Sequence, residues 1–378
     1  MMEDQAPLKN DLSFCFKGVV LRISCGKRTR SIFLNKREGA SRRPGQSGLL
    51  RPFIPVLVLI LIIGGTGSTA KADSFIFLPL IRSAPAGPFL AGCPLLPADN
   101  IWNTPVDNLP LDPNSNAYIN TIGPGRHVHA DFGAGTWAGF RIGIPFNIVP
   151  GNQPKSSVIF YYPSESDPGP YPIPDQPLIE GDPNGSGDRH ILIIDRDNCI
   201  LYELYDASQQ NGQWSAGSGA IFPLNSHSLR PAGWTSADAA GLPMLPGLVR
   251  YEEVASGEIR HALRFTVPQT RRAYIWPARH YASDLTESRY PPMGQRFRLK
   301  AGYDISQFSA QARVIAQALK KYGLILADNG SAWYISGAPD ECWDNDVLHE
   351  LDVILGSDFE AVDESSLMVD PNSGQARP

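Results

Sequence analysis

Residues 257–283, which read GEIRHALRFTVPQTRRAYIWPARHYAS, carry the pattern from which the fold is inferred. Two short runs rich in β-branched and aromatic residues, 262–267 and 272–276, are separated by the turn-forming sequence Pro-Gln-Thr-Arg. This pattern predicts two β-strands joined by a turn. The pairs Arg260-His261 and Arg279-His280 lie at the edges of these runs, so the stretch is also a candidate site on a β scaffold.

The rest of the chain after residue 97 repeats this pattern of short apolar runs separated by proline and glycine. The runs 190–195 and 200–205 flank Arg-Asp-Asn-Cys, a sequence that favours a hairpin turn. Residues 309–322 place apolar side chains on one helical stripe, with Ser309 as the expected N-cap and Gly323 at the end. We predict a mainly β fold, a two-sheet antiparallel sandwich of jelly-roll type with one amphipathic helix. The alternative is an α+β fold with a single large sheet.

The N-terminal region, residues 1–72, resembles a secretory signal. A long basic segment precedes the apolar run PFIPVLVLILIIGG at 52–65, and Ala70-Lys71-Ala72 fits a cleavage site. A run of about 14 residues is shorter than the roughly 20 that span a bilayer. We therefore expect a secreted, extracellular protein. The alternative is a protein anchored in the membrane by an uncleaved N-terminal segment, and the length of the basic segment suggests that translation starts further downstream.

The remaining chain is expected to contain a Pro/Ala/Gly-rich linker at 73–96, one β-rich domain at 97–365 and a flexible tail at 366–378. Removal of residues 1–72 leaves 21 basic and 34 acidic residues, a formal charge of −13. Such a surface repels phosphate backbones, which argues against nucleic acid as a partner. Three cysteines remain, Cys93, Cys199 and Cys342, and two of them could pair in an oxidising compartment. The sequence leaves the choice of pair open.

Four of the seven histidines, His127, His190, His261 and His280, directly follow an arginine. One interpretation is structural, with Arg and His side chains binding carboxylates and backbone carbonyls at the ends of strands. The other is a cleft in which arginine neutralises a substrate carboxylate while histidine moves a proton, as β-elimination from an acidic polysaccharide requires. On the second interpretation the catalytic candidates are His280, Arg279, His261 and His190.

Candidate substrate-binding residues are Trp234 and Trp343 in loop-like segments, Asp188 and Arg189 at the start of an expected strand, and Asp328 at the end of another. In a strand, His127, His129 and Asp131 would lie on one face, which makes them candidate metal ligands. The signatures of serine hydrolases, P-loop NTPases and dinucleotide-binding proteins are missing from the sequence. We expect no cofactor.

Several blocks, among them GDRHILIID, RHALRFT, WPARHYAS and LILADNGSAWYISGAPD, resemble a family of secreted, largely uncharacterised bacterial proteins that share them. The resemblance covers roughly residues 97–362. It implies a single secreted domain and assigns no catalytic residue. The phrase LKAGYDISQ is also similar to a strand of jelly-roll alginate lyases, although the spacing of Tyr303 departs from that pattern.

These observations lead to one functional expectation and two alternatives. We expect a secreted protein that acts on or binds an extracellular polysaccharide or cell-wall glycan, as a hydrolase or lyase. The first alternative is a cell-surface or carbohydrate-binding module without catalytic activity. The second is a metal-dependent enzyme that uses His127, His129 and Asp131.

Overall fold

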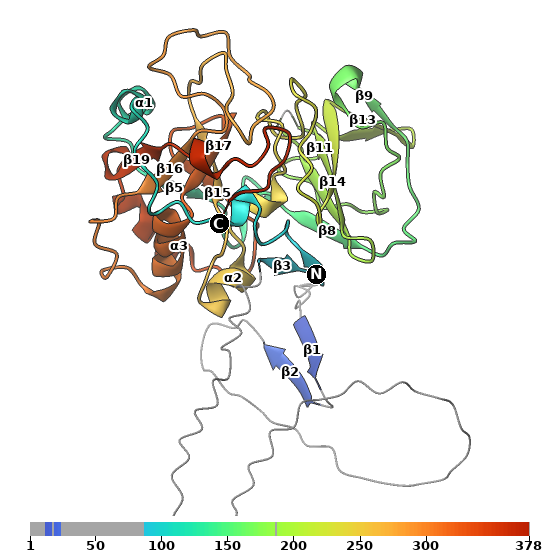
Figure 1. The fold of residues 1–378 in the computed structure, drawn as a ribbon. Coiled ribbons are helices and arrows are strands. Elements are labelled where there is room, and N and C mark those ends of the chain that lie inside the picture. Colours follow the sequence, from blue (N-terminus) through green and yellow to red (C-terminus); the bar gives the residue numbers. More distant parts are fainter. Residues whose placement is uncertain (1–11, 17–18, 24–86, 186, 378) are drawn as a thin grey trace, which may run out of the picture. The chain divides into compact units, whose positions relative to one another are not determined.

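The computed structural model describes residues 12–16, 19–23, 87–185 and 187–377 (Figure 1). The chain forms two units, residues 1–82 and 83–378. In the first unit, β1 (Leu12–Phe16) pairs with β2 (Val19–Ile23) in antiparallel register. The apolar run 52–65 and the expected cleavage site lie outside the described residues. None of the helices formed by the described residues is long and apolar enough to cross a membrane.

A six-stranded sheet forms one half of the larger unit. Its strands, in order across the sheet, are β19 (Phe359–Val362), β16 (Arg296–Leu299), β17 (Leu324–Asn329), β15 (Leu263–Val267), β18 (Tyr334–Ser336) and β5 (His129–Asp131). Helix α3 (Ala310–Lys321) packs against β16 and buries Ile315 and Leu319 in the main core. Figure 1 shows these elements together on one side of the unit.

The other half contains a four-stranded sheet, in the order β14 (Ser218–Pro223), β11 (Ile200–Tyr205), β10 (Ile191–Asp195) and β8 (Phe146–Val149). A three-stranded sheet of β12 (Ser208–Gln210), β13 (Gln213–Ala216) and β9 (Val158–Phe160) accompanies it (Figure 1). Strand β10 is buried on both faces. Its Leu192 and Ile194 join the main core, whereas Ile191 and Ile193 join a second, smaller core. This explains why β10 is continuously apolar rather than alternating.

The prediction of a mainly β chain is confirmed, because the larger unit is rich in strands and poor in helix. The predicted hairpin is also confirmed, since β10 and β11 pair in antiparallel register. The finer prediction of a two-sheet antiparallel sandwich is not confirmed. The described strands form several sheets, and the pairs β8–β10, β9–β13, β15–β17 and β5–β18 are parallel.

Only the first strand predicted in residues 257–283 exists. Strand β15 is central in its sheet, with β17 on one side and β18 on the other. Both hydrogen-bonding edges are therefore occupied by later parts of the chain, and residues 272–276 cannot pair with it. They form no strand, and Tyr274 makes an isolated bridge with Met293. The predicted hairpin at this position is wrong.

Helix α3 matches the predicted stripe, but the expected cap does not form. The Ser309 side chain makes no capping hydrogen bond. Instead, the Ser309 backbone N–H donates to a carboxylate oxygen of Glu350 at 2.7 Å. Gly323, which follows the helix, has a φ of +67°, a backbone conformation that side chains other than glycine rarely adopt.

The folded domain begins before residue 97. Strand β3 (Phe89–Leu90) pairs with β4 (Cys93–Pro94), and Leu95 is fully buried. Cys93 forms a disulfide with Cys199, with 5.3 Å between the two Cα atoms. This resolves the choice that the sequence left open, and Cys342 lies outside the disulfide. The end of the predicted linker is thus part of the domain.

Residues 366–377 also pack on the domain, although their polar composition predicted a flexible tail. The Ala376 side chain is buried, and its backbone N–H donates to the Asp99 carbonyl at 2.8 Å. The Arg279 guanidinium donates to the Pro371 carbonyl at 2.7 Å and to the Asn372 side chain at 2.9 Å. Polar contacts with distant residues hold this segment, and composition alone does not show them.

Candidate functional site

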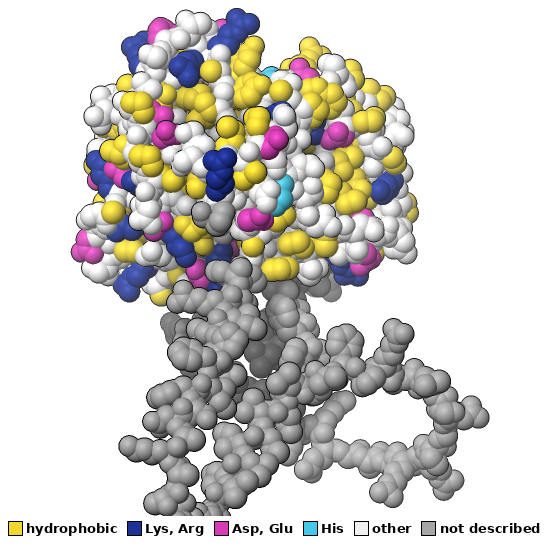
Figure 2. Space-filling view, in the orientation of Figure 1, with side chains coloured by type: hydrophobic (Ala, Val, Ile, Leu, Met, Phe, Trp, Pro, Cys, Tyr) yellow, Lys and Arg dark blue, Asp and Glu magenta, His cyan; other side chains and the backbone are white. Residues whose placement is uncertain are grey.

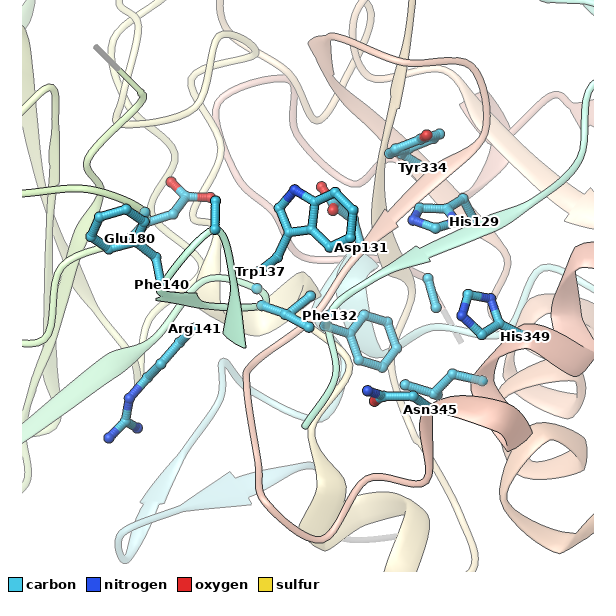
Figure 3. Close-up of a pocket in the computed structure, with 16 residues that line it drawn as sticks. His129, Asp131, Phe132, Trp137, Phe140, Arg141, Glu180, Tyr334, Asn345 and His349 are labelled. Atoms are coloured by element: carbon cyan, nitrogen blue, oxygen red, sulfur yellow. The ribbon is translucent and has the colours of Figure 1, made fainter. Parts of the chain in front are cut away.

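A cavity of about 670 Å³, here called the β5 cavity, lies beside edge strand β5 (Figure 3). Its wall is formed by strands β5 and β18, the hairpin of β6 (Thr136–Trp137) and β7 (Phe140–Arg141), helix α4 (Asn345–Leu348) and the chain at Glu180. Its polar lining residues are His129, Asp131, Arg141, Glu180, Tyr334, Asn345 and His349. The cavity therefore gathers side chains from widely separated parts of the sequence.

Strand β5 supplies two of these side chains because residues two apart in a strand face the same side. His129 and Asp131 both line the cavity, and His129 lies beside Tyr334 of β18, with 4.4 Å between the ring centroids. His127 is not among the lining residues, and its Nδ1 atom contacts the Asp352 carbonyl instead. The structure thus brings together two of the three predicted metal ligands.

The two carboxyl groups in the wall of the cavity have oppositely shifted pKa values. Loss of hydration raises the pKa of Asp131, attraction to His129 partly offsets this, and the negative charge of Glu180 raises it further. Burial alone would raise the pKa of Glu180 as well, but the charge of His190 and its hydrogen bond outweigh burial and hold that pKa below its usual value. The pKa of Asp131 is thus shifted upward and that of Glu180 downward, although Asp131 is exposed, so water screens its shift.

His190 is held in one orientation directly before β10. Its Nδ1 atom forms an ion pair with Glu180, and its Nε2 atom lies 3.0 Å from the Ala237 carbonyl oxygen. Burial would lower the pKa of His190, but the adjacent Glu180 carboxylate raises it to about 9. His190 is the one predicted catalytic residue for which the structure shows a contact with a residue lining the β5 cavity.

A buried polar cluster lies next to this pair. Arg264 of β15 donates two hydrogen bonds to Asp238, at 2.8 and 2.9 Å, and one to the Ser336 hydroxyl at 2.6 Å. Asp328 lies 3.4 Å from the same guanidinium. Burial and the negative charge of Asp238 raise the pKa of Asp328 to about 7, against the opposing charge of Arg264. Asp328, which is partly exposed, thus contacts the buried charge pair of Arg264 and Asp238.

The other predicted catalytic residues lie elsewhere. His261 is fully buried, with its Nε2 atom 3.0 Å from a Glu253 carboxylate oxygen. Arg279 is buried, and its guanidinium donates to the Arg230 carbonyl at 2.7 Å. His280 lies with its Nδ1 atom 2.9 Å from the Ala239 carbonyl oxygen. None of the three lines the β5 cavity.

The predicted substrate-binding residues are also dispersed. Trp343 is buried and packs on Phe132, with 5.1 Å between ring centroids. The Arg230 guanidinium lies over the Trp234 ring at 5.4 Å, and Arg189 forms an ion pair with Asp206. Asp188 lies close to Glu180 and His190.

Sequence reasoning missed Trp137 and Glu180. The Trp137 side chain is 81% exposed and lines the cavity. The available signal was its context, GAGTWAGF, because glycines on both sides of a tryptophan indicate a turn rather than a core strand. Glu180 lies at the end of an apolar segment, just before a Gly/Asp-rich loop. It becomes part of a site only because this loop folds back and brings Glu180 next to His190.

The described part of the domain also holds buried carboxyl groups that make its stability depend on pH. Glu203 of β11 is fully buried and accepts hydrogen bonds from the backbone N–H groups of Met244 and Leu245, each at 3.0 Å. Burial raises the pKa of Glu203 from 4.5 to about 7, and those hydrogen bonds only partly oppose it.

Because the folded pKa exceeds the unfolded one, the folded state binds more protons between these values. The stability that Glu203 contributes is therefore complete below about pH 4.5 and is lost as the pH rises to about 7. We expect Glu203→Gln to flatten the dependence of unfolding free energy on pH in this window, measured by urea denaturation. The exposed Glu287→Gln serves as the control. An unchanged pH dependence in Glu203→Gln would contradict this assignment.

No family model, curated protein sequence or solved structure matches this chain.

Proposed function

We propose that this protein binds an extracellular carbohydrate in the β5 cavity. The observation that carries the proposal is the combination of the exposed Trp137 indole with carboxylate, imidazole and amide side chains in one cavity (Figure 3). A sugar ring has apolar faces that stack on an indole and hydroxyl groups that hydrogen-bond to polar side chains. Asp131 and Glu180 provide such polar groups, whereas the Asn345 amide already hydrogen-bonds to the Ala134 backbone.

The charges around the cavity favour a neutral glycan over a uronic-acid polymer. Asp131 and Glu180 both contribute carboxyl groups, and Arg141 points away from them in Figure 3. Arg279 and His280, which would neutralise and deprotonate a uronate, are not among the lining residues. A neutral polysaccharide or cell-wall glycan is therefore the proposed ligand class.

Other features support an extracellular glycan rather than nucleic acid. A disulfide such as Cys93–Cys199 persists in oxidising compartments, which supports export. Acidic side chains lie among the Lys and Arg side chains on the face shown in Figure 2. Mixed charge of this kind does not provide the continuous basic surface that a phosphate backbone requires.

Trp137→Ala is expected to weaken glycan binding roughly tenfold, because the aromatic stacking surface is lost. The measurement is affinity electrophoresis or calorimetry of the purified protein against a panel of neutral glycans. Tyr161→Ala is the matched control, since Tyr161 is 78% exposed and lies outside the cavity. Equal affinities for wild-type protein and Trp137→Ala would remove the β5 cavity as the binding site.

A second candidate function, hydrolysis of the bound glycan, is favoured by the two carboxyl groups. Glycoside hydrolysis needs one carboxyl group that keeps its proton and one that is ionised. The raised pKa of Asp131 suits the proton donor, and the lowered pKa of Glu180 suits the ionised partner that activates water.

If hydrolysis occurs, Asp131→Asn is expected to reduce the release of reducing ends at least a hundredfold while glycan affinity stays within a few-fold of wild type. Reducing-end assays and binding measurements on the same preparation separate the two effects. Glycan binding by the wild-type protein without any product would leave the carbohydrate-binding function and exclude hydrolysis of that glycan.

A further inference from the structure

We propose that Glu180, Asp188 and His190 bind a divalent transition-metal ion, such as Zn²⁺ or Mn²⁺, at the edge of the β5 cavity. One ligand atom from each residue lies within 4.8 Å of the other two. His190 Nδ1 is in direct contact with a Glu180 carboxylate oxygen, so an ion bound by all three residues would replace the proton between these two atoms and move them apart. The site differs from the metal site predicted from His127, His129 and Asp131.

The local chain conformation holds the three residues together. The Glu180 backbone N–H donates to the His190 carbonyl at 3.1 Å, which closes the intervening loop. The Asp206 backbone N–H donates to the Asp188 carbonyl at 2.7 Å, and Arg189 has a φ of +45°. A non-glycine residue in that conformation is uncommon and needs support from its surroundings. The ion pair between Arg189 and Asp206 provides such support.

His190 is oriented as metal-binding histidines usually are. A carbonyl oxygen can only accept, so His190 Nε2, 3.0 Å from the Ala237 carbonyl, carries a proton. Its other nitrogen, Nδ1, then faces Glu180. A backbone carbonyl on the far nitrogen is the usual outer contact of a metal-bound imidazole, where it fixes the tautomer. The ring is 2% exposed and so has one available orientation.

The charges in the Glu180–Asp188–His190 cluster also suit a cation. The Asp188 carboxylate is exposed, lies close to the Glu180 carboxylate, and places a second negative charge beside His190. Two carboxylates and a neutral imidazole together carry two negative charges, which offset the charge of a divalent ion. Mg²⁺ and Ca²⁺ prefer oxygen-only sites, whereas the imidazole ligand favours Zn²⁺ and the two carboxylates also suit Mn²⁺. Three protein ligands leave coordination positions open, as in catalytic metal sites.

The cation site shares Glu180 with the proposed glycan site, but its binding is measured without any glycan. A failure to bind metal would therefore leave the proposed carbohydrate binding untouched, and the reverse also holds. When an ion is bound, Glu180 acts as a ligand, so we expect the rate of any glycan hydrolysis to differ between chelator-treated and metal-loaded protein.

The test is calorimetric titration of Zn²⁺, and separately Mn²⁺, into the full chain after treatment with chelator and dialysis. We expect one ion per chain for at least one of these metals. Binding should release protons, seen as a dependence of the heat on buffer ionisation enthalpy, because His190 must give up its Nδ1 proton. Asp188→Asn and His190→Gln are each expected to weaken binding at least tenfold.

Asp188→Asn is the more informative variant, because Asp188 is exposed and its side chain makes no described contact that folding needs. Asp175→Asn, another exposed aspartate upstream of the same loop, is the matched control and should bind as wild type does. The proposal is overturned if neither metal binds. It is also overturned if Asp188→Asn binds with wild-type affinity, or if His129→Ala abolishes binding while His190→Gln does not.

Discussion

Arg264→Met is expected to lower the free energy of unfolding by about 3–5 kcal/mol. Arg264 and Asp238 are both buried and share two hydrogen bonds, so loss of the guanidinium leaves the Asp238 carboxylate buried without its partner. Removing one member of a buried ion pair lowers the free energy of unfolding by more than the intact pair adds to it. The charge that remains in the protein interior has lost its hydration and has no partner. Urea denaturation followed by tryptophan fluorescence measures the change.

Two controls separate this effect from a general loss of charge. Lys321→Met removes a cation from an exposed pair with Glu258, and we expect a loss of less than about 1 kcal/mol. The double variant Arg264→Met/Asp238→Asn should recover part of the stability, since the unpaired charge is then absent. A loss for Arg264→Met no larger than that for Lys321→Met would show that the cluster does not stabilise the fold.

Loss of the Cys93–Cys199 disulfide is expected to cost about 2–5 kcal/mol. The bond joins residues 106 apart in the sequence, so it removes many conformations from the unfolded chain. It also joins strand β4, which precedes the main part of the domain, to the turn between β10 and β11. The double variant Cys93→Ser/Cys199→Ser, measured by urea denaturation, gives the magnitude.

Reductant provides an independent check of this result. Reduced wild-type protein should match the double serine variant in stability, whereas reductant should leave the double variant unchanged. Cys342→Ser is the control, because Cys342 lies outside the disulfide, and its loss should stay below about 1 kcal/mol. Equal stability of oxidised and reduced wild-type protein would show that the bond does not stabilise the domain.

Local patterns predicted several elements well. The runs that form β10, β11 and β15 are rich in Ile, Leu and Tyr or Phe, and such short apolar runs fit a half-buried or buried strand. The stripe containing Ile315 and Leu319 predicted α3 because its repeat is that of a helix. In these segments the local preference and the final fold agree.

Which strands pair with each other could not be predicted in the same way. The run 272–276 has strand-like composition, but β17 and β18 occupy both edges of β15. Hydrogen bonds between strands are made by backbone groups, which are the same in every residue except proline. Composition therefore indicates that a segment can be a strand without indicating which strand it joins.

In the candidate site, too, local patterns indicated individual residues but not which of them lie together. The sequence drew attention to His190 and Asp188 because both lie at the edge of a strand, and to His129 and Asp131 because alternate residues of a strand share a face. It did not connect these residues with Glu180, Trp137 or Tyr334. Those connections depend on the loop that returns Glu180 to His190 and on the parallel pairing of β5 with β18.

Local sequence patterns were enough to predict that the chain is mainly β, where its clearest strands and helix lie, and which polar residues flank them. The pairing of the strands, the choice of the two bonded cysteines, and the grouping of carboxyl groups with an exposed tryptophan in the β5 cavity became known only from the three-dimensional fold. The difference arises from how far apart in the sequence the interacting residues lie. Strand and helix preferences depend on neighbouring residues, whereas the cavity and the cation site depend on contacts between residues far apart in the chain, whose cost in chain entropy is repaid only when the whole domain folds.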